Sequence, residues 1–539
     1  MKTERLWSLT FFAFWLIALS AAQAAAPPRP LEEIYPGVAT LRTSAEEMIC
    51  LLDTEHPEER RKALGDRPPS SHALESLRLQ LELELGGLPC VLAHASMLTA
   101  ADLSRPNLKA VIVYPRSKSA GAEADKRLFT LLRECRAPML CMGGAQGLLA
   151  IAYGGKVANM RKLNPGESDP DPSYMPGWFK EVGYASVRVV ERDPIFEGFG
   201  DTFTVYQRHA SEVKELPPQF KVLASTDACR VQVCRHRERP QYGVVFAPER
   251  FSKEHPDGKR ILQNFFRLAG IDIERQLPKT QAAARARIRQ LVAAVCQEPR
   301  VMRQQKQPFV TLVDIEGPEA VASQRRGSGS GRTHAEKMEE FRRRIETELS
   351  GLPCVVVHHA EVTREDFANP HLRAILLTGA TSASVKPLCQ DLFAVIREGN
   401  IPILGVCAGH QHIALAHGVD TDLMRMLRKD EKDPNPKYHP GRYKEWGFQP
   451  VQIIKRDPLF DGLPDTIVVQ QYHVGKVKSL PDDFDLLART DECEVQVMKR
   501  RGKPVYGTQF HPENYNDEHP HGKLLLQNFF RIAAQWRKS

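Results

Sequence analysis

The chain has 539 residues, more than one ordinary hydrophobic core includes, so two or more domains are expected. Hydrophobic residues make up 42% and charged residues 26%, which are ordinary globular values and exclude a chain that is disordered throughout. The net charge of +8 comes from 74 basic and 66 acidic residues spread along the chain. Without interleaved aromatic residues or a nucleic-acid motif, this excess indicates a solvated surface and no nucleic-acid partner.

The first residues have the pattern of a secretory signal peptide. Lys2 and Arg5 precede an apolar run over residues 9–22, and Ala22-Gln-Ala24 offers a cleavage site of small residues. We therefore expect residues 1–24 to be removed and the protein to be exported, to the periplasm or the extracellular space. An uncleaved membrane anchor is the alternative, but the run is shorter than the ~20 residues that span a bilayer comfortably.

Eleven cysteines in an exported chain would ordinarily suggest disulfide bonds. Their placement favours another interpretation, because Cys90 and Cys354 occupy matching positions in an internal repeat, as do Cys229 and Cys493. Each lies beside apolar residues at the end of an expected strand. We predict buried free thiols.

The internal repeat covers most of the chain. Gly87-Leu-Pro-Cys90 recurs as Gly351-Leu-Pro-Cys354, 264 positions later, and Leu262-Gln-Asn-Phe-Phe-Arg267 recurs at the same offset as Leu526-Gln-Asn-Phe-Phe-Arg531. An unbroken register over 180 residues indicates two copies of one domain rather than many short repeats. We expect the two copies to share one strand order and to pack against each other.

These landmarks divide the chain into a first copy at residues 31–275, a linker at 276–304 and a second copy at 305–539. The linker is predicted to be helical, because residues 281–296 are rich in Ala, Arg and Leu and contain no Gly or Pro.

Within the second copy, short apolar runs alternate with amphipathic stretches. Strands are predicted at 309–313, 354–357, 374–377 and 401–406, and helices at 334–348 and 384–398. This alternation is typical of a parallel sheet with helices on both faces. The later runs, at 448–454, 466–470, 485–490, 494–499 and 505–510, predict a strand-rich antiparallel part. The predicted fold class is therefore α/β.

A candidate nucleophile follows the strand at 401–406. In Gly405-Val-Cys407-Ala-Gly409, small residues on both sides allow a sharp turn between strand and helix, so that Cys407 projects from the top of the sheet, partly exposed, at the start of a helix that stabilises a thiolate. The backbone N–H of Ala408 would face a developing oxyanion. A buried structural cysteine is the alternative for this motif taken alone.

A matching base and its acceptor stand near the C-terminus, in Tyr506-Gly-Thr-Gln-Phe-His-Pro-Glu513. A cysteine nucleophile needs a base within hydrogen-bond reach, and that base needs an acceptor that fixes its tautomer. His511 and Glu513 provide both. We predict a Cys407, His511 and Glu513 triad.

These motifs, with the intervening Gln471-Tyr-His473, Lys476-Val-x-x-Leu-Pro481 and Asp457-Pro-Leu-Phe-x-Gly462, resemble the class I glutamine amidotransferase family, and most of all the amidotransferase domain of GMP synthetase. The resemblance covers about residues 305–535 and the repeat extends it to the first copy. It implies two tandem flavodoxin-like α/β domains, each a mostly parallel sheet with helices on both faces plus an antiparallel flap.

The resemblance also implies roles for individual residues. Cys407 would attack the side-chain amide of glutamine and form a γ-glutamyl thioester, His511 would move the proton and Glu513 would orient His511. The backbone N–H groups of Ala408 and Gly379 would form the oxyanion hole. The residues expected around the bound glutamine are Gln411, Tyr472 and His473.

One loop differs from the family pattern. The family usually carries Ser-Gly-Gly-Pro where this chain has Thr378-Gly379-Ala380-Thr381. If the second glycine requires a positive φ, Ala380 would cost about 1 kcal/mol and misalign the oxyanion hole.

The first copy departs further from the family. The repeat places Gly143 at the position of Cys407 and Ala247 at that of His511, and only Glu249 survives, opposite Glu513. Arg208 replaces Tyr472, and Tyr114-Pro115 replaces Thr378-Gly379. We therefore predict a degenerate, non-catalytic first domain.

No cofactor is implied. Neighbouring histidines at 410, 412 and 417 lack Cys, Asp or Glu partners in the pattern of a metal site, so no metal is predicted. Neither a Walker A loop nor a Ser-Gly-Gly-Val-Asp nucleotide loop is present in the 539 residues, so an ammonia acceptor would be a separate partner protein. Three functions remain open: hydrolysis of glutamine, hydrolysis of γ-glutamyl peptides, and ligand binding or scaffolding without catalysis.

Overall fold

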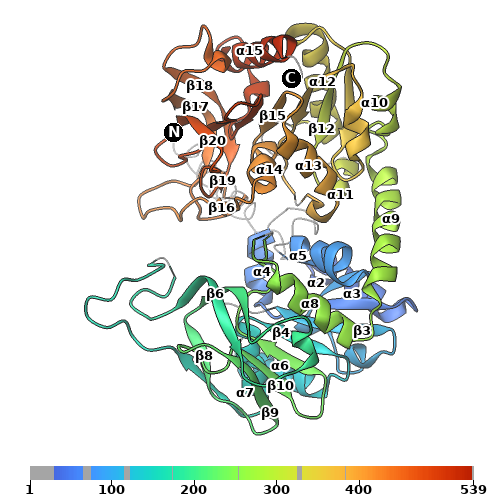
Figure 1. The fold of residues 1–539 in the computed structure, drawn as a ribbon, viewed down its shortest axis with the longest axis vertical. Helices are drawn as coiled ribbons and strands as arrows, with labels where there is room; N and C mark the ends of the chain where they lie inside the picture. Colours follow the sequence, from blue (N-terminus) through green and yellow to red (C-terminus); the bar gives the residue numbers. More distant parts are fainter. Residues whose placement is uncertain are drawn as a thin grey trace, which may run out of the picture.

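The computed structural model describes residues 29–64, 74–114, 122–172, 174–252, 254–323, 331–382, 384–436 and 438–536. It contains two domains, one above the other in Figure 1, joined by a long helix along one side. The expected signal peptide at 1–24 and Pro115 lie outside the described residues. No helix in the described part of the chain has the length and apolar character needed to cross a membrane.

Each domain is built on one nine-stranded sheet, and the order of strands is the same in both. The first sheet has the order β2 (Cys90–His94), β1 (Met48–Asp53), β3 (Leu108–Tyr114), β4 (Met139–Met142), β11 (Gln241–Val244), β10 (Val233–His236), β9 (Phe220–Ser225), β6 (Glu181–Val189) and β7 (Thr202–His209). The second has β13 (Cys354–His358), β12 (Phe309–Asp314), β14 (Leu372–Leu377), β15 (Ile403–Val406), β22 (Val505–Thr508), β21 (Val497–Arg500), β20 (Phe484–Arg489), β17 (Glu445–Ile453) and β18 (Thr466–His473). The predicted common fold of the two copies is confirmed.

The pairing divides each sheet into two parts. In the second domain the pairs from β13 through β22 are parallel, and the pairs from β22 through β18 are antiparallel. The antiparallel part therefore continues the parallel sheet. Every residue of β12 and β15 is buried, as in a sheet covered on both faces. A separate strand pair completes each domain: β5 (Lys156–Asn159) with β8 (Ser211–Glu215), and β16 (Thr421–Leu423) with β19 (Gly475–Val477).

Helices flank both sheets (Figure 1). The first domain has α2 (Leu31–Ile34), α3 (Gly37–Thr43), α4 (Pro57–Leu64), α5 (Glu75–Gln80), α6 (Ala122–Glu134), α7 (Gly144–Ala152) and α8 (Asp257–Leu268). The second has α11 (Pro318–Ala322), α12 (His334–Arg344), α13 (Gln390–Glu398), α14 (Ala408–Ala416) and α15 (His521–Gln535). In the second domain α13 packs against α14, which contacts β14, β15 and β22.

Between the domains lie α9 (Ile273–Val292) and the short α10 (Arg300–Gln304). The first part of α9 is bonded to the first domain, where Gln281 donates its side-chain amide to the carbonyl of Leu83 at 2.7 Å. Further along α9, Arg285 donates to the carbonyl of Ala360 in the second domain. Leu83 is buried in one apolar cluster with Val292 and Leu388, so the two domains share part of a core.

All eleven cysteines are buried and free, which confirms the prediction of thiols rather than disulfides. Many predicted elements differ from the structure at one or both ends, as the strand expected at 494–499 does by beginning at Val497. The helix expected at 334–348 continues beyond Arg344 as a π-helical turn, Ile345–Leu349. The helix expected at 384–398 is a short turn, Lys386–Leu388, followed by α13. The strand expected at 401–406 begins at Ile403, because Pro402 has no N–H to donate to the ladder.

Candidate active site

Cys407 connects β15 to α14 and has the backbone of a strained elbow, with φ 49° and ψ −102°. Among the described residues other than glycine, only it, Met175 and His439 have a positive φ. Such strain at a turn that carries a thiol is typical of a functional site. Cys407 is 7% exposed, so the expectation of a partly exposed side chain is wrong.

Gly409 permits the sharp turn after Cys407. A Cβ atom at Gly409 would lie 2.5 Å from the carbonyl oxygen of Leu377, at the end of β14. Any side chain here would push the first turn of α14 away from the sheet. The Gly409 N–H donates to the carbonyl of Thr378 at 2.9 Å, which joins the elbow to the loop after β14.

His511 and Glu513 lie just beyond β22. The His511 N–H donates to the carbonyl of Gln470 in β18 at 2.8 Å, which fixes the backbone of the histidine against the sheet. Its Nδ1 atom is 2.7 Å from Oε1 of Glu513. Arg344 donates to the carbonyl of Glu513 at 2.7 Å and so holds this segment from α12. The arrangement matches a histidine oriented by a carboxylate.

The thiol of Cys407 acts on the same imidazole. Burial by itself lowers the pKa of His511, but the charge of Glu513 and the neighbouring Cys407 outweigh burial and raise this pKa well above its usual range. The structure therefore brings together the three residues predicted as a triad. The arrangement can accept a proton at His511 while a thiolate forms at Cys407.

Gly379 lies against both His511 and Cys407. A Cβ atom at this position would be 2.7 Å from Cε1 of His511 and 3.4 Å from Cβ of Cys407. Neither the N–H of Gly379 nor that of Ala408 donates to a backbone carbonyl in the described parts of the chain. Both amides therefore stay available beside the elbow, as an oxyanion hole requires.

The loop after Gly379 lacks the strain expected from its sequence. Ala380 is not among the described residues with a positive φ, so the cost predicted for an alanine at this position does not arise. The loop follows an ordinary backbone path that alanine adopts freely.

The residues expected around the substrate divide into two groups. The ring of Tyr472 meets His511 edge to face, with 6.4 Å between ring centroids. Gln411 donates its amide to Oε1 of Gln509 at 3.2 Å, and Gln509 in turn reaches the Cys407 sulfur at 3.6 Å. The side chain of His473 pairs with Glu445 instead, with 2.9 Å between its Nε2 and the Oε2 of the glutamate. The structure therefore places Tyr472 and Gln411 beside the triad and His473 in a buried network.

Sequence reasoning missed three contributors. Gln509 stands in the His511 motif, but the motif alone assigns it no role. The other two, Trp446 and Tyr438, form an aromatic cluster with Tyr472, with centroid distances of 3.9 Å for Trp446 and 6.4 Å for Tyr438. The residues of this aromatic cluster come from three separate segments, and no local motif indicates that they meet.

Each domain has one described group of three residues whose possible metal-binding atoms lie within 4.8 Å of one another. These groups are Glu445, His473 and Cys493 in the second domain and Glu181, His209 and Cys229 in the first. The geometry favours a hydrogen-bonded network. Gln496 and Thr490 donate to the two carboxylate oxygens of Glu445, and Nδ1 of His473 pairs with the carbonyl of Gly475 at 2.9 Å. N–H and O–H groups directed at a carboxylate occupy the positions that a cation would need.

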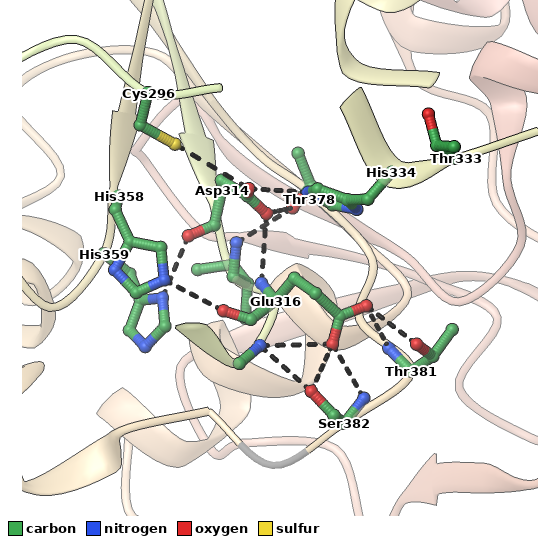
Figure 2. Close-up of polar contacts among 12 residues, drawn as sticks. Cys296, Asp314, Glu316, Thr333, His334, His358, His359, Thr378, Thr381 and Ser382 are labelled. Carbon is green, nitrogen blue, oxygen red and sulfur yellow. Dashed lines mark hydrogen bonds and ion pairs between the residues drawn. The ribbon is translucent and has the colours of Figure 1, made fainter. Parts of the chain in front are cut away.

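A second polar network lies at the end of β12, next to the loop after β14 (Figure 2). Asp314 is fully buried and its Oδ2 lies 2.7 Å from Nε2 of His334, at the start of α12. Burial raises the pKa of Asp314, but His334 outweighs it and lowers the value to about 2. Burial lowers the pKa of His334, yet Asp314 raises it overall. The pair ties α12 to the sheet beside the active site.

The first domain keeps the elbow without the cysteine and the histidine. Gly143 joins β4 to α7 with φ 57° and ψ −132°, close to the backbone of Cys407. Ala247 takes the place of His511, and its N–H makes the equivalent bond to Tyr206 at 3.0 Å. Arg208 stands over the ring of Tyr174 at 5.3 Å, where the second domain has stacked aromatic rings. The described part of this site contains neither nucleophile nor base.

Comparisons with known proteins identify the family of both halves of the chain. Residues 88–269 and 342–533 each match the model of the family described as "Glutamine amidotransferase class-I". A glutamine-hydrolyzing GMP synthase subunit of Pyrococcus furiosus is 34% identical over 163 residues, which are 30% of this chain and 77% of the relative. The protein of the same name from Methanopyrus kandleri is 36% identical over 185 residues, 34% of this chain and 88% of the relative. The solved structure of a glutamine amidotransferase from Thermotoga maritima has 18% identity and a TM-score of 0.29, covering 42% of this chain and 99% of its own.

Proposed function

Because this chain belongs to the class I glutamine amidotransferase family, in both of its halves, we propose that its second domain hydrolyses the side-chain amide of glutamine. Cys407 is the nucleophile, His511 the proton carrier and Glu513 the residue that orients it. The observation that carries the proposal is the strained elbow at Cys407 beside a histidine with a carboxylate behind it. The first domain is proposed to be non-catalytic.

The first half-reaction forms a thioester. The Cys407 sulfur attacks the amide carbon of glutamine, a C–S bond forms, and the carbonyl oxygen becomes an oxyanion that the N–H groups of Gly379 and Ala408 stabilise. His511 takes the thiol proton and gives it to the amide nitrogen, the C–N bond breaks, and ammonia leaves. The raised pKa of His511 supports its role in holding that proton.

The second half-reaction restores the thiol. A water molecule loses a proton to His511 and attacks the thioester carbon, the C–S bond breaks, and the sulfur recovers the proton from His511. The products of one cycle are glutamate and ammonia, with one water consumed. Gln509 donates to the Cys407 sulfur at 3.6 Å and would stabilise negative charge on it between cycles.

A second candidate reaction is hydrolysis of a γ-glutamyl amide that carries a larger amine, such as a γ-glutamyl peptide. The aromatic cluster favours it: the ring of Tyr472 contacts both His511 and Trp446, and Tyr438 extends the surface. Ammonia needs no such surface. A planar or apolar amine would stack on it, a contact worth about 1 kcal/mol.

Trp446→Ala separates the two reactions. If the substrate carries a planar amine, kcat/KM for γ-glutamyl anilide should fall about fivefold, while that for glutamine stays within about twofold. Phe448→Ala is the matched control, because its ring lies on the same strand but stacks on His519, with 4.0 Å between centroids. Equal losses with both substrates would favour glutamine.

A partner protein that accepts ammonia is also proposed. The relatives from Pyrococcus furiosus and Methanopyrus kandleri are named as subunits of GMP synthase, which supports a function within an assembly. The third possibility, a domain that binds γ-glutamyl ligands without hydrolysis, predicts glutamine binding without ammonia release. Measuring ammonia from purified protein separates catalysis from binding alone.

Export by a cleaved signal peptide is proposed from residues 1–24. Lys2 and Arg5, the apolar run and Ala22-Gln-Ala24 support it. Expression of the whole chain in a bacterial host followed by N-terminal sequencing should give a mature chain that begins at Ala25. Full-length protein retained in the cytoplasm would contradict export and leave the hydrolytic proposal unaffected.

A further inference from the structure

Glu316 follows β12 and carries a carboxylate buried against the loop after β14, with 4% of the residue exposed (Figure 2). Its Oε2 accepts hydrogen bonds from the backbone N–H and the hydroxyl of Thr381, both at 2.8 Å. Its Oε1 accepts from the N–H and hydroxyl of Ser382, at 2.8 and 2.5 Å, and from the N–H of Gly317 at 3.1 Å. The Glu316 side chain therefore accepts hydrogen bonds from the N–H and hydroxyl groups of two consecutive loop residues.

The beginning of the same loop is held from two other directions. The hydroxyl of Thr378 accepts from the N–H of Ile315 at 2.9 Å, directly before Glu316 in the chain. The carbonyl of Thr378 accepts from the N–H of Gly409 at 2.9 Å, in the first turn after Cys407. Gly379 therefore lies between a segment bonded to the elbow and a segment bonded to Glu316.

The sequence of the loop explains why an acceptor is needed. Thr381 stands where the resemblance expects a proline, which has no N–H and a fixed φ. Threonine at this position is freer in the backbone, and although Thr381 is exposed, its N–H and its hydroxyl both donate to a protein acceptor. Glu316 supplies that acceptor and replaces the missing rigidity with charge-assisted hydrogen bonds.

We infer that Glu316 is a positioning residue. It acts through Thr381 and Ser382 to hold the N–H of Gly379 toward the substrate amide that Cys407 attacks. The inference rests on the proposed function, because it gives the loop the role of an oxyanion hole. An oxyanion donor is effective only when its direction is fixed before the charge develops. Glu316 fixes the direction of the Gly379 N–H from the part of the loop that is not bonded to the elbow.

The first domain provides a matched control. Glu55 is the equivalent residue, and its N–H donates to Oδ1 of Asp53 at 3.0 Å just as that of Glu316 donates to Asp314 at 3.0 Å. The carbonyls of both glutamates accept from a histidine, His94 at 2.6 Å and His358 at 2.9 Å. Glu55→Ala therefore makes the same chemical change at the matching backbone position, on a side chain that is less buried than Glu316 and at a site with no proposed chemistry.

The test compares Glu316→Ala with Glu55→Ala in the complete mature chain. In Glu316→Ala, kcat for glutamine should fall about 30-fold or more, because one oxyanion donor is worth roughly 100-fold when it is lost entirely. Alkylation of Cys407 by iodoacetamide, which forms no oxyanion, should stay within about twofold, because the triad remains intact. Glu55→Ala should leave both rates unchanged. Glu316→Gln, which keeps one acceptor oxygen, should lie between Glu316→Ala and the natural protein.

Two results would overturn the inference. Hydrolysis by Glu316→Ala within about threefold of the natural protein would show that the loop needs no such support. A parallel loss of iodoacetamide alkylation would show a general disturbance of the site. If Glu316→Ala does not fold, the double variant Thr381→Ala and Ser382→Ala, which removes both hydroxyl donors, replaces it with a smaller expected loss of about fivefold.

Amide hydrogen exchange tests the loop without reference to activity. Glu316→Ala should speed exchange in peptides that cover residues 377–389, and Glu55→Ala should not. If the natural protein hydrolyses no amide, the proposed function fails. In that case faster exchange would still support the hold of Glu316 on the loop, and unchanged exchange would refute it.

Discussion

Nδ1 of His511 lies 2.7 Å from Oε1 of Glu513, two residues further along the chain, with Pro512 between them. This short spacing places the carboxylate behind the imidazole by local geometry alone. Because Nδ1 is engaged by Glu513, Nε2 is left to exchange a proton with the thiol of Cys407. In the first domain Ala247 stands in place of His511, so the retained Glu249 has no imidazole to orient at the equivalent position.

Glu513→Gln tests this relationship. The amide keeps the size of the carboxylate but can direct an N–H toward Nδ1, which favours the wrong tautomer of His511, so kcat should fall about 100-fold to 10,000-fold. Ammonia release from glutamine measures it. Glu249→Gln is the matched control at the equivalent position of the first domain and should leave kcat unchanged.

Gly379→Ala tests the closeness of the loop to the triad. The new Cβ atom would stand 2.7 Å from Cε1 of His511, so the ring must move away from Cys407 and hydrolysis should fall about 100-fold. Thermal unfolding should change by only a few degrees. Gly200→Ala is the control, since nothing lies within 4 Å of its added Cβ. Full activity in Gly379→Ala would contradict the described approach of the loop to His511.

The ion pair of Asp314 and His334 should make stability depend on pH. The pKa of His334 is raised in the folded protein, so its contribution is complete below the unfolded value of about 6.5 and is lost as pH rises through the folded value. Asp314, with a folded pKa of about 2, contributes above the unfolded value of about 3.9 and loses this contribution as pH falls toward 2.

His334→Ala should therefore lower the free energy of unfolding by about 3 kcal/mol at pH 6, because a buried carboxylate loses its partner. At pH 9 the loss should shrink to about 2 kcal/mol, because a neutral imidazole still donates a hydrogen bond to the Asp314 carboxylate. Urea unfolding at both pH values measures the difference. His519→Ala, whose ring stacks on Phe448 instead, should show no such dependence. A loss that is larger at pH 9 would contradict the ion pair.

Restoring the missing residues of the first domain should not restore activity. Gly143→Cys with Ala247→His supplies a nucleophile and a base beside Glu249, yet Arg208 stands over Tyr174 where the second domain has Tyr472, so the substrate surface differs. Catalysis needs substrate and oxyanion held by preorganised groups. Both variants are made in a chain that also carries Cys407→Ala, which removes the proposed activity of the second domain. In that chain the double variant should release ammonia no faster than Ala247→His alone. Turnover that depends on the new cysteine would show a competent pocket.

Much of the fold could be predicted from the sequence because the two copies share their turn residues and apolar runs. The offset of 264 between Cys90 and Cys354 identifies equivalent strands in the two copies, and the apolar runs indicate the parallel strands. Some boundaries failed beside a proline, since Pro402 delays β15 and Pro387 lies in the turn that precedes α13. Others failed with no proline at the boundary, since β21 begins at Val497 rather than 494 and β17 begins at Glu445 rather than 448.

The active site was predictable where a motif is local in sequence or where the resemblance assigns a residue a place, as it does for Gln411 and Tyr472. Cys407 lies in a recognisable elbow, and His511 and Glu513 are two residues apart. Glu316 meets Thr381 across 65 residues, and Trp446 meets Tyr472 only through the pairing of β17 with β18. Such contacts depend on how strands are ordered in the sheet, which periodicity does not specify.

Cys407 is proposed to hydrolyse an amide with the help of His511. The most direct measurement is mass spectrometry of the purified mature chain after rapid acid quenching with glutamine or a γ-glutamyl peptide, together with ammonia or amine release. We expect steady release and a γ-glutamyl adduct on the peptide that contains Cys407, both absent in Cys407→Ala and unchanged in Cys229→Ala. Release that persists in Cys407→Ala, or the absence of both release and adduct in the natural protein, would contradict the account.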